Sequence, residues 1–263
     1  MATSSEQANQ QTVAGRQVRI AYFRFDRLFF SGMAAAILLS VLIGFAESYY
    51  LQGVAHIPHW RAFNTPPYPL LVHLHGLIFS LWILLLITQT SLVAANRLRL
   101  HRKLGIVGFI LAFLLVLLGV AIVCESMARH VPIGHPSIGG QSVALLNIFG
   151  FAVLAYLGYR QRRNPPAHKR LMIVATISLL PVAFSRWPIL HDGTHLRAAA
   201  CCFVLAALIA CYDIWSAAKV YPATLLGAAV LLLTNPPIVE TLIHNSMWFR
   251  LSLPLQSVGR YLH

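Results

Sequence analysis

The sequence LHRKLGIV at residues 100–107 is nearly repeated as AHKRLMIV at residues 167–174. Each copy places one histidine among lysine and arginine, at the point where a polar loop gives way to a long apolar run. In a chain built mostly of such runs, the repeat indicates two membrane helices that are entered from the same side. His101 and His168 then lie at the mouths of these two helices, each with a ring that can gain or lose a proton.

The composition is that of a membrane protein. Of 263 residues, 58% are hydrophobic and 10% are charged, whereas soluble domains carry about 25% charged residues. Because a helix needs roughly 20 apolar residues to cross the hydrocarbon core, the runs predict an all-α polytopic membrane helix bundle of seven transmembrane helices. These helices are expected at residues 28–48, 69–95, 105–123, 141–159, 171–189, 197–214 and 222–243.

The distribution of cations predicts the orientation of this bundle. The net charge of +13 could suggest a nucleic-acid partner. With seven helices and the N-terminus inside, however, fourteen Lys and Arg residues fall on the inner side and six on the outer side, which is the positive-inside bias. We therefore expect no nucleic acid as a partner, but a bacterial cytoplasmic (inner) membrane protein with its C-terminus outside and its basic loops against the headgroups of the lipid bilayer.

The predicted organisation is one membrane domain with two short extensions. Residues 1–27 are polar and then basic, and we expect a disordered N-terminus that ends in a juxtamembrane segment. Residues 28–245 form the seven-helix domain, and residues 246–263 form a short outer tail. Kinks are expected at Pro181 and at residues 235–237, because proline interrupts the helical hydrogen-bond ladder.

Small residues recur at every fourth position of the first and sixth predicted helices. They are Gly32, Ala36, Ser40 and Gly44 in the first helix, and Ala198, Cys202, Ala206 and Ala210 in the sixth. Such stripes let two helix backbones approach closely in lipid. We therefore expect helix packing, and no chemistry, from these residues.

Histidines and glycines on the second and third predicted helices suggest a cofactor. His75, Trp82 and Gln89 are spaced seven apart and share one helix face, whereas His73 lies about 200° away from His75. On the third helix, His101 is followed on its own face by two glycines at positions 105 and 108, which leave room for a flat macrocycle. Imidazole is a normal axial ligand of haem iron. The candidate cofactor-binding residues are His75, Gln89, His101 and His168.

Three functions remain open from these residues. The first is haem b binding in electron transfer or respiratory oxidase assembly, with a respiratory-chain partner and His101 and His168 as ligands, or His75 with an outer histidine. The second is a zinc-dependent membrane hydrolase, because zinc enzymes need three protein ligands and an open water position. Its candidate ligands on the outer side are His75, His191, His195 and Glu240. The third is a transporter or structural membrane subunit, in which the histidines relay protons or lie at the interface and bind lipid headgroups.

Several of these motifs resemble a family of uncharacterised bacterial seven-helix membrane proteins. The residues that carry the resemblance are HLHG at 73–76, Trp82, Gln89, LHRKLG at 100–105, HKRLM at 168–172 and Tyr212-Asp213. The resemblance covers residues 28–245 and implies the fold, but no established activity.

The loop-then-helix pattern of histidine, cation and leucine is also similar to small membrane proteins of haem-copper oxidase assembly and to transmembrane b-type cytochromes. This similarity implies haem. Those cytochromes place paired histidines on one helix, whereas no helix of this chain offers that spacing, and Gln89 stands where a second ring would be needed. The resemblance therefore implies one haem rather than two.

Overall fold

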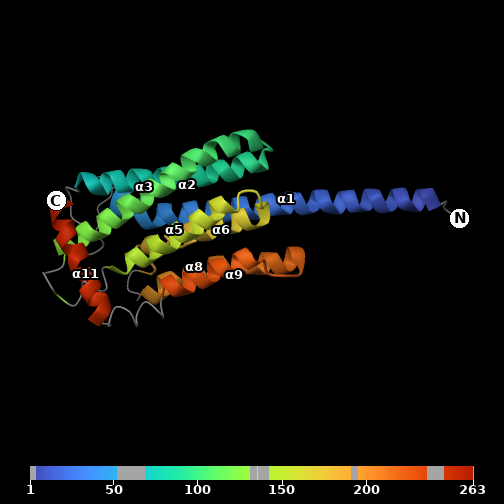
Figure 1. Cartoon of the computed structure of the whole chain (residues 1–263). Coiled ribbons are helices and arrows are strands. Elements are labelled where there is room, and N and C mark those ends of the chain that lie inside the picture. The colour runs from blue at the N-terminus through green and yellow to red at the C-terminus, as the bar shows by residue number, and fades with distance from the viewer. Residues whose placement is uncertain are drawn as a thin grey trace.

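Helices account for almost all of the chain that the structure describes (Figure 1). The computed structural model describes residues 4–51, 69–130, 135, 142–190, 195–235 and 246–262, and gives the backbone alone for residues 4–24, 130 and 195. Within these ranges no strand occurs, which confirms the all-α prediction. Successive long helices run side by side in opposite directions, and the two ends of the chain lie at opposite ends of the bundle (Figure 1).

The described residues between 4 and 130 include three long helices. Helix α1 spans Ser4–Phe45 and continues into a π-helical turn, η1, at Ala46–Tyr50. Helix α2 spans Leu70–Ala94, and α3 spans Leu98–His130. The turn between α2 and α3 is tight because Asn96 takes a left-handed conformation with φ of 59°, which asparagine adopts more readily than most residues. The backbone of the N-terminal segment is helical from Ser4 on.

The middle of the chain forms a helical hairpin with a break in its second arm. Helix α5 spans Ala144–Arg160, and α6 spans Pro165–Ile177. Helix α6 ends four residues before Pro181, and the short helix α7 then occupies Pro181–Phe184. This interruption confirms the predicted kink, because proline cannot donate a backbone hydrogen bond to the preceding turn.

The described residues from 195 onward include two antiparallel helices and a helix near the C-terminus. Helix α8 spans His195–Ala217, α9 spans Pro222–Thr234, α11 spans Ser246–Gly259, and a 3-10 turn, η3, follows at Arg260–Leu262. The segment expected as a tail is thus mostly helical. Helix α11 packs on α3: Gly259 lies directly against the backbone carbonyl of Cys124, and Gln256 donates to the carbonyl of Met127 at 3.2 Å.

Among the described residues, five helical segments are long and apolar enough to cross a membrane, which indicates a multi-pass membrane protein. They are Phe25–Tyr50, Leu70–Ala94, Leu98–Arg129, Pro165–Phe184 and Leu196–Ala217. Helices α5 and α9 are also apolar but have only 17 and 13 residues. Five of the seven predicted crossings therefore meet the requirement of length. The fourth corresponds to the shorter helix α5, and the seventh, predicted at 222–243, lies partly outside the described residues.

The segment formed by α6 and α7 lies at the centre of the bundle. In its most apolar 18-residue stretch, 67% is buried inside the bundle, compared with 17% for the same length of α2 and 22% for α3. Helix α6 contacts α5, α9, α1 and α8, whereas the α2–α3 hairpin lies at the edge (Figure 1). A side chain at the start of α6 can therefore reach several neighbouring helices.

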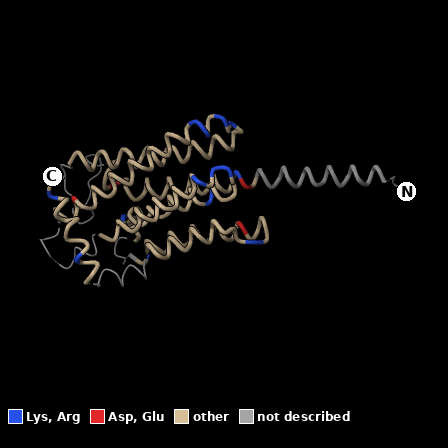
Figure 2. Tube along the Cα trace, viewed as in Figure 1, with Lys and Arg blue, Asp and Glu red and all other residues tan. Residues whose placement is uncertain are grey.

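Lysine and arginine gather at one end of the bundle (Figure 2). This end contains the turns that join α2 to α3, α5 to α6 and α8 to α9, and it is called the basic end below. The opposite end carries α11 and is called the α11 end (Figure 1). This arrangement agrees with the prediction that the basic loops lie on one side of the bundle.

Candidate functional site

Two histidines from different helices lie next to each other at the basic end. His101 is the fourth residue of α3, and His168 is the fourth residue of α6. Their ring centroids are 6.2 Å apart, and the ring planes are inclined by 83°. The two copies of the sequence repeat thus occupy equivalent positions in two helices, and the structure brings together the pair that the sequence predicted. Both lie within the first helical turn rather than at the edge of a loop.

The ring of His168 is fixed by a hydrogen bond to helix α5. Its Nδ1 lies 2.8 Å from the backbone carbonyl oxygen of Gly158. Because a carbonyl can only accept, Nδ1 must carry the proton, and Nε2 of the neutral ring is left with its lone pair available. This is the arrangement that orients a histidine as a metal ligand. The approach is close, since a Cβ at Gly158 would stand 2.7 Å from Sδ of Met172.

Within the described part of the chain, His101 and Gln89 each carry one unpaired polar atom. Its Nδ1 and the Oε1 atom of Gln89 are both buried, and neither has a hydrogen-bond partner among the described residues. The backbone of Gln89 interacts with the His101 ring, so the end of α2 belongs to the same site. Buried polar atoms in proteins are nearly always paired. The unpaired Nδ1 atom within the histidine pair therefore indicates a place for a ligand or for ordered water.

The glycines that follow His101 on α3 differ in their surroundings. A Cβ at Gly105 would meet no atom within 4 Å, whereas one at Gly108 would lie 3.1 Å from Leu85. The space predicted beside His101 is therefore open at Gly105 and filled by α2 at Gly108. A flat group could approach the α3 backbone only near the first of these glycines.

His75 lies at the other end of α2 from this pair. It precedes Gln89 by two heptads, which corresponds to about 21 Å along a helix. Its Nδ1 is buried and unpartnered in the described part of the chain, and its ring stacks on Phe79 with centroids 6.3 Å apart. Arg186, at the end of the α7 segment, acts on this ring electrostatically. His75 is thus a separate polar position at the α11 end and cannot share a ligand with His101.

The predicted zinc site is only partly within the structure. His191 and Glu240 lie outside the described residues, and of His195 only the backbone at the start of α8 is described. Among the described residues, no group of three His, Cys, Asp or Glu side chains is arranged to hold a metal ion. The zinc site stays a prediction.

Trp82 lies midway between His75 and Gln89 on the stripe of α2. It is 3% exposed, its Nε1 donates to Oγ1 of Thr176 on α6 at 3.2 Å, and its ring meets Phe151 of α5 edge to face with centroids 5.1 Å apart. The stripe of His75, Trp82 and Gln89 therefore faces the bundle interior.

Two ion pairs beside His168 were not foreseen from the sequence. Lys169 pairs with Asp26 of α1, and Arg170 pairs with Asp213 of α8. Because successive residues of a helix point about 100° apart, the sequence His168-Lys169-Arg170 reaches α5, α1 and α8 in turn. The start of α6 is thereby anchored in three directions, which fixes the backbone that carries His168.

The Arg170–Asp213 pair is completely enclosed. Both side chains are 0% exposed. The second carboxylate oxygen of Asp213 accepts from the Thr224 hydroxyl at 2.6 Å and from the backbone N–H of Tyr221 at 3.1 Å. The Arg170 guanidinium also lies 3.9 Å from the centroid of the Tyr221 ring. The signal in the sequence was an acidic residue inside an apolar run, which requires a partner at membrane depth.

Comparisons with known protein families, with characterised proteins and with solved structures found no match to this chain. The resemblances drawn from the motifs therefore stay predictions, and the candidate function rests on the geometry of the site.

Proposed function

We propose that this protein binds one haem b between His101 and His168 and transfers electrons at the basic end of a membrane-embedded bundle. The observation that carries the proposal is the 6.2 Å separation of the two ring centroids. With metal–nitrogen bonds of about 2.0 Å, two imidazoles on opposite sides of one metal ion have ring centroids roughly 6 Å apart. The donor set, two histidines from different helices, is one that haem proteins use.

The surrounding residues support this assignment. The Gly158 carbonyl holds the His168 ring so that Nε2 is the available nitrogen, and the unpaired atoms of His101 and Gln89 need an explanation. The α3 backbone is uncovered at Gly105. When bound, a haem supplies one-electron redox chemistry. The protein residues orient the two imidazoles and keep the start of α6 rigid through the ion pairs of the neighbouring residues.

The proposal includes a membrane topology. We place the basic end at the cytoplasmic face of a bacterial inner membrane, because Lys and Arg concentrate on that side of such proteins. With α5 and α9 counted as short crossings, the chain passes the bilayer seven times and its termini lie on opposite sides. Fusion of a reporter enzyme to each terminus tests this topology, and two termini on one side would contradict it.

A haem titration of matched histidine variants tests the site. Detergent-purified protein is titrated with hemin and followed by visible absorption for the wild type, His101→Ala, His168→Ala and His73→Ala. His73 is the control because it is exposed on α2 and bonds to Tyr49 at the α11 end. We expect the His101 and His168 variants to bind haem at least about tenfold more weakly, since a ligand should matter no less than the supporting residues around it, while the His73 variant binds as the wild type.

Two outcomes would contradict the assignment. Equal haem binding by all four proteins would show that the pair is not the ligand set. A colourless protein that retains stoichiometric zinc, and that loses this zinc in His75→Ala, would move the site to the α11 end. Thermal unfolding of each variant in detergent distinguishes a lost ligand from a lost fold.

A further inference from the structure

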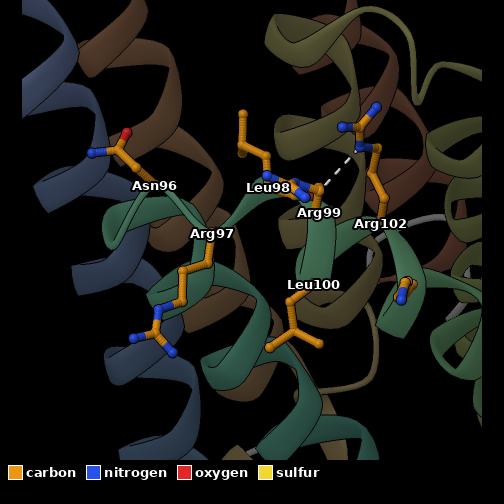
Figure 3. A pocket seen from close by; sticks show the side chains of 7 residues that line it. Asn96, Arg97, Leu98, Arg99, Leu100 and Arg102 are labelled. Atoms are coloured by element: carbon orange, nitrogen blue, oxygen red, sulfur yellow. Dashed lines mark hydrogen bonds between the residues drawn. The ribbon is translucent and has the colours of Figure 1, made fainter.

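The tight turn between α2 and α3 forms an open cavity lined mainly by cations (Figure 3). The cavity has a volume of about 690 Å³, and its lining consists of residues 96–100, 102 and 103. Four of these residues are cationic: Arg97, Arg99, Arg102 and Lys103. Arg97 and Arg102 extend to opposite sides of the turn, with Leu98 and Leu100 between them (Figure 3).

Helix α1 holds this turn in place. Nη2 of Arg27 donates to Oδ1 of Asn96 at 2.5 Å, and Nη1 of the same side chain donates to the carbonyl of Ala94 at 3.3 Å. The backbone N–H of Arg97 donates to the carbonyl of Leu92 at 2.8 Å. The cations therefore project from a fixed turn, and the first turn of α3, whose N–H groups favour anions, begins inside the cavity.

The four cations of the turn have no acidic partner among the described residues. The ion pairs of the described residues use Arg129, at the α11 end, and Lys169 and Arg170, at the basic end. Asp26 and Asp213, the acids near the basic end, are therefore already paired with cations of α6. Arg102 makes a hydrogen bond of 3.4 Å to the backbone carbonyl of Leu98 (Figure 3), which leaves its charge uncompensated. The cavity therefore favours an anionic partner.

An exposed apolar stripe continues from this cavity along α3. Leu98 is 51% exposed, and the stripe descends through Ile106, Ile110 and Phe113, which are 66%, 54% and 60% exposed. These residues are spaced four, four and three apart from Arg102 onward, so they share one helix face. A partner that satisfies both features has an anionic head and an apolar tail, which a soluble phosphate or a nucleic acid lacks.

We propose that the α2–α3 turn is a specific binding site for the headgroup of an anionic phospholipid, whose acyl chain lies along the exposed stripe of α3. Basic pockets of membrane proteins at the cytoplasmic face are known to hold such headgroups. The proposal is independent of haem, because the lining residues are not ligands of the proposed cofactor.

Native mass spectrometry of the full chain, released from mixed micelles, measures this binding. The lipids are phosphatidylglycerol and phosphatidylcholine with identical acyl chains. The test variant is Arg97→Gln/Arg99→Gln/Arg102→Gln/Lys103→Gln. The matched control removes the same four charges from other turns at the same end: Arg160→Gln/Arg162→Gln/Arg163→Gln/Lys219→Gln. Two of the control arginines lie over tyrosine rings of α5, Arg160 over Tyr156 and Arg162 over Tyr159.

We expect the wild type and the control to retain phosphatidylglycerol over phosphatidylcholine, and the test variant to lose this preference by at least tenfold. Equal losses in both variants would show that the attraction is spread over the whole basic end and would overturn the specific site. If soluble glycerol phosphate displaced phosphatidylglycerol from the turn, the proposal that the site binds a lipid would be overturned. If the fourfold variant fails to fold, Arg97→Gln and Arg102→Gln made singly give the same test, each with a smaller expected loss.

Discussion

Removal of the Asp213 carboxylate leaves the Arg170 guanidinium buried without its ion-pair partner. Asp213 accepts from Nε of Arg170 at 2.9 Å and also from Nη2 of the same side chain. Two further donors, Thr224 and the Tyr221 amide, lose their acceptor in the same variant. Breaking a buried pair by removing one partner costs about 3–5 kcal/mol. We therefore expect Asp213→Ala to lower the free energy of unfolding by this amount.

The second ion pair of α6 provides the internal control. The side chains of Lys169 and Asp26 are 24% and 15% exposed, so water can replace the lost carboxylate. We expect Asp26→Ala to cost at most about 1 kcal/mol, the value of a solvent-accessible pair. The two variants remove the same chemical group from neighbouring pairs. They differ in burial and in the other donors that lose an acceptor, which are two for Asp213 and the Tyr212 hydroxyl for Asp26.

Reversible unfolding in mixed micelles, titrated with sodium dodecyl sulfate and followed by circular dichroism, gives both free energies. The double variant Arg170→Met/Asp213→Leu completes the test. It should be less destabilised than Asp213→Ala, because it leaves neither charge buried alone. The reasoning is refuted if Asp213→Ala costs no more than Asp26→Ala, since Arg170 would then be hydrated or paired without its carboxylate.

Two further variants test the packing of the bundle. Gly44→Val places a Cβ against the carbonyl of Ala183, and overpacking of this kind should lower the free energy of unfolding by about 1–3 kcal/mol. The control is Gly32→Val, whose Cβ would meet no atom within 4 Å and which should change the free energy of unfolding little. Equal effects of the two variants would argue against a close contact between α1 and α7. Trp82→Phe removes the hydrogen bond to Thr176 together with one ring of a buried indole, so it should cost at least the roughly 0.5–1.5 kcal/mol of the hydrogen bond in the same titration. An unchanged stability would contradict the buried contact between α2 and α6.

The helices and the histidine pair could be predicted from local patterns. Long apolar runs locate the helices, and the repeated motif places His101 and His168 at equivalent positions, so both signals lie within a few residues of the feature they predict. The interruption before Pro181 was predicted for the same reason. Of the two small-residue stripes, the first gives a direct backbone contact at Gly44, whereas Gly32 meets no neighbour.

The features that were missed depend on long-range contacts. Asp26 and Lys169 are 143 residues apart in the chain, and Asp213 lies 43 residues beyond Arg170. No local pattern links such partners, because their pairing follows from how α1, α6 and α8 pack. The helical form of residues 246–259 was also missed. This segment lacks a long apolar run, and its place is set by contacts with α3 such as that of Gln256.

The visible absorption spectrum of the wild-type protein tests the central claim most directly. The protein is purified in detergent from cells supplied with a haem precursor, and the spectrum is recorded in the oxidised state and after reduction with dithionite. The proposal predicts a Soret band, sharp α and β bands on reduction, and about one haem per chain, as expected for one iron held by two histidines. A folded protein that remains colourless, even after incubation with hemin, would contradict it.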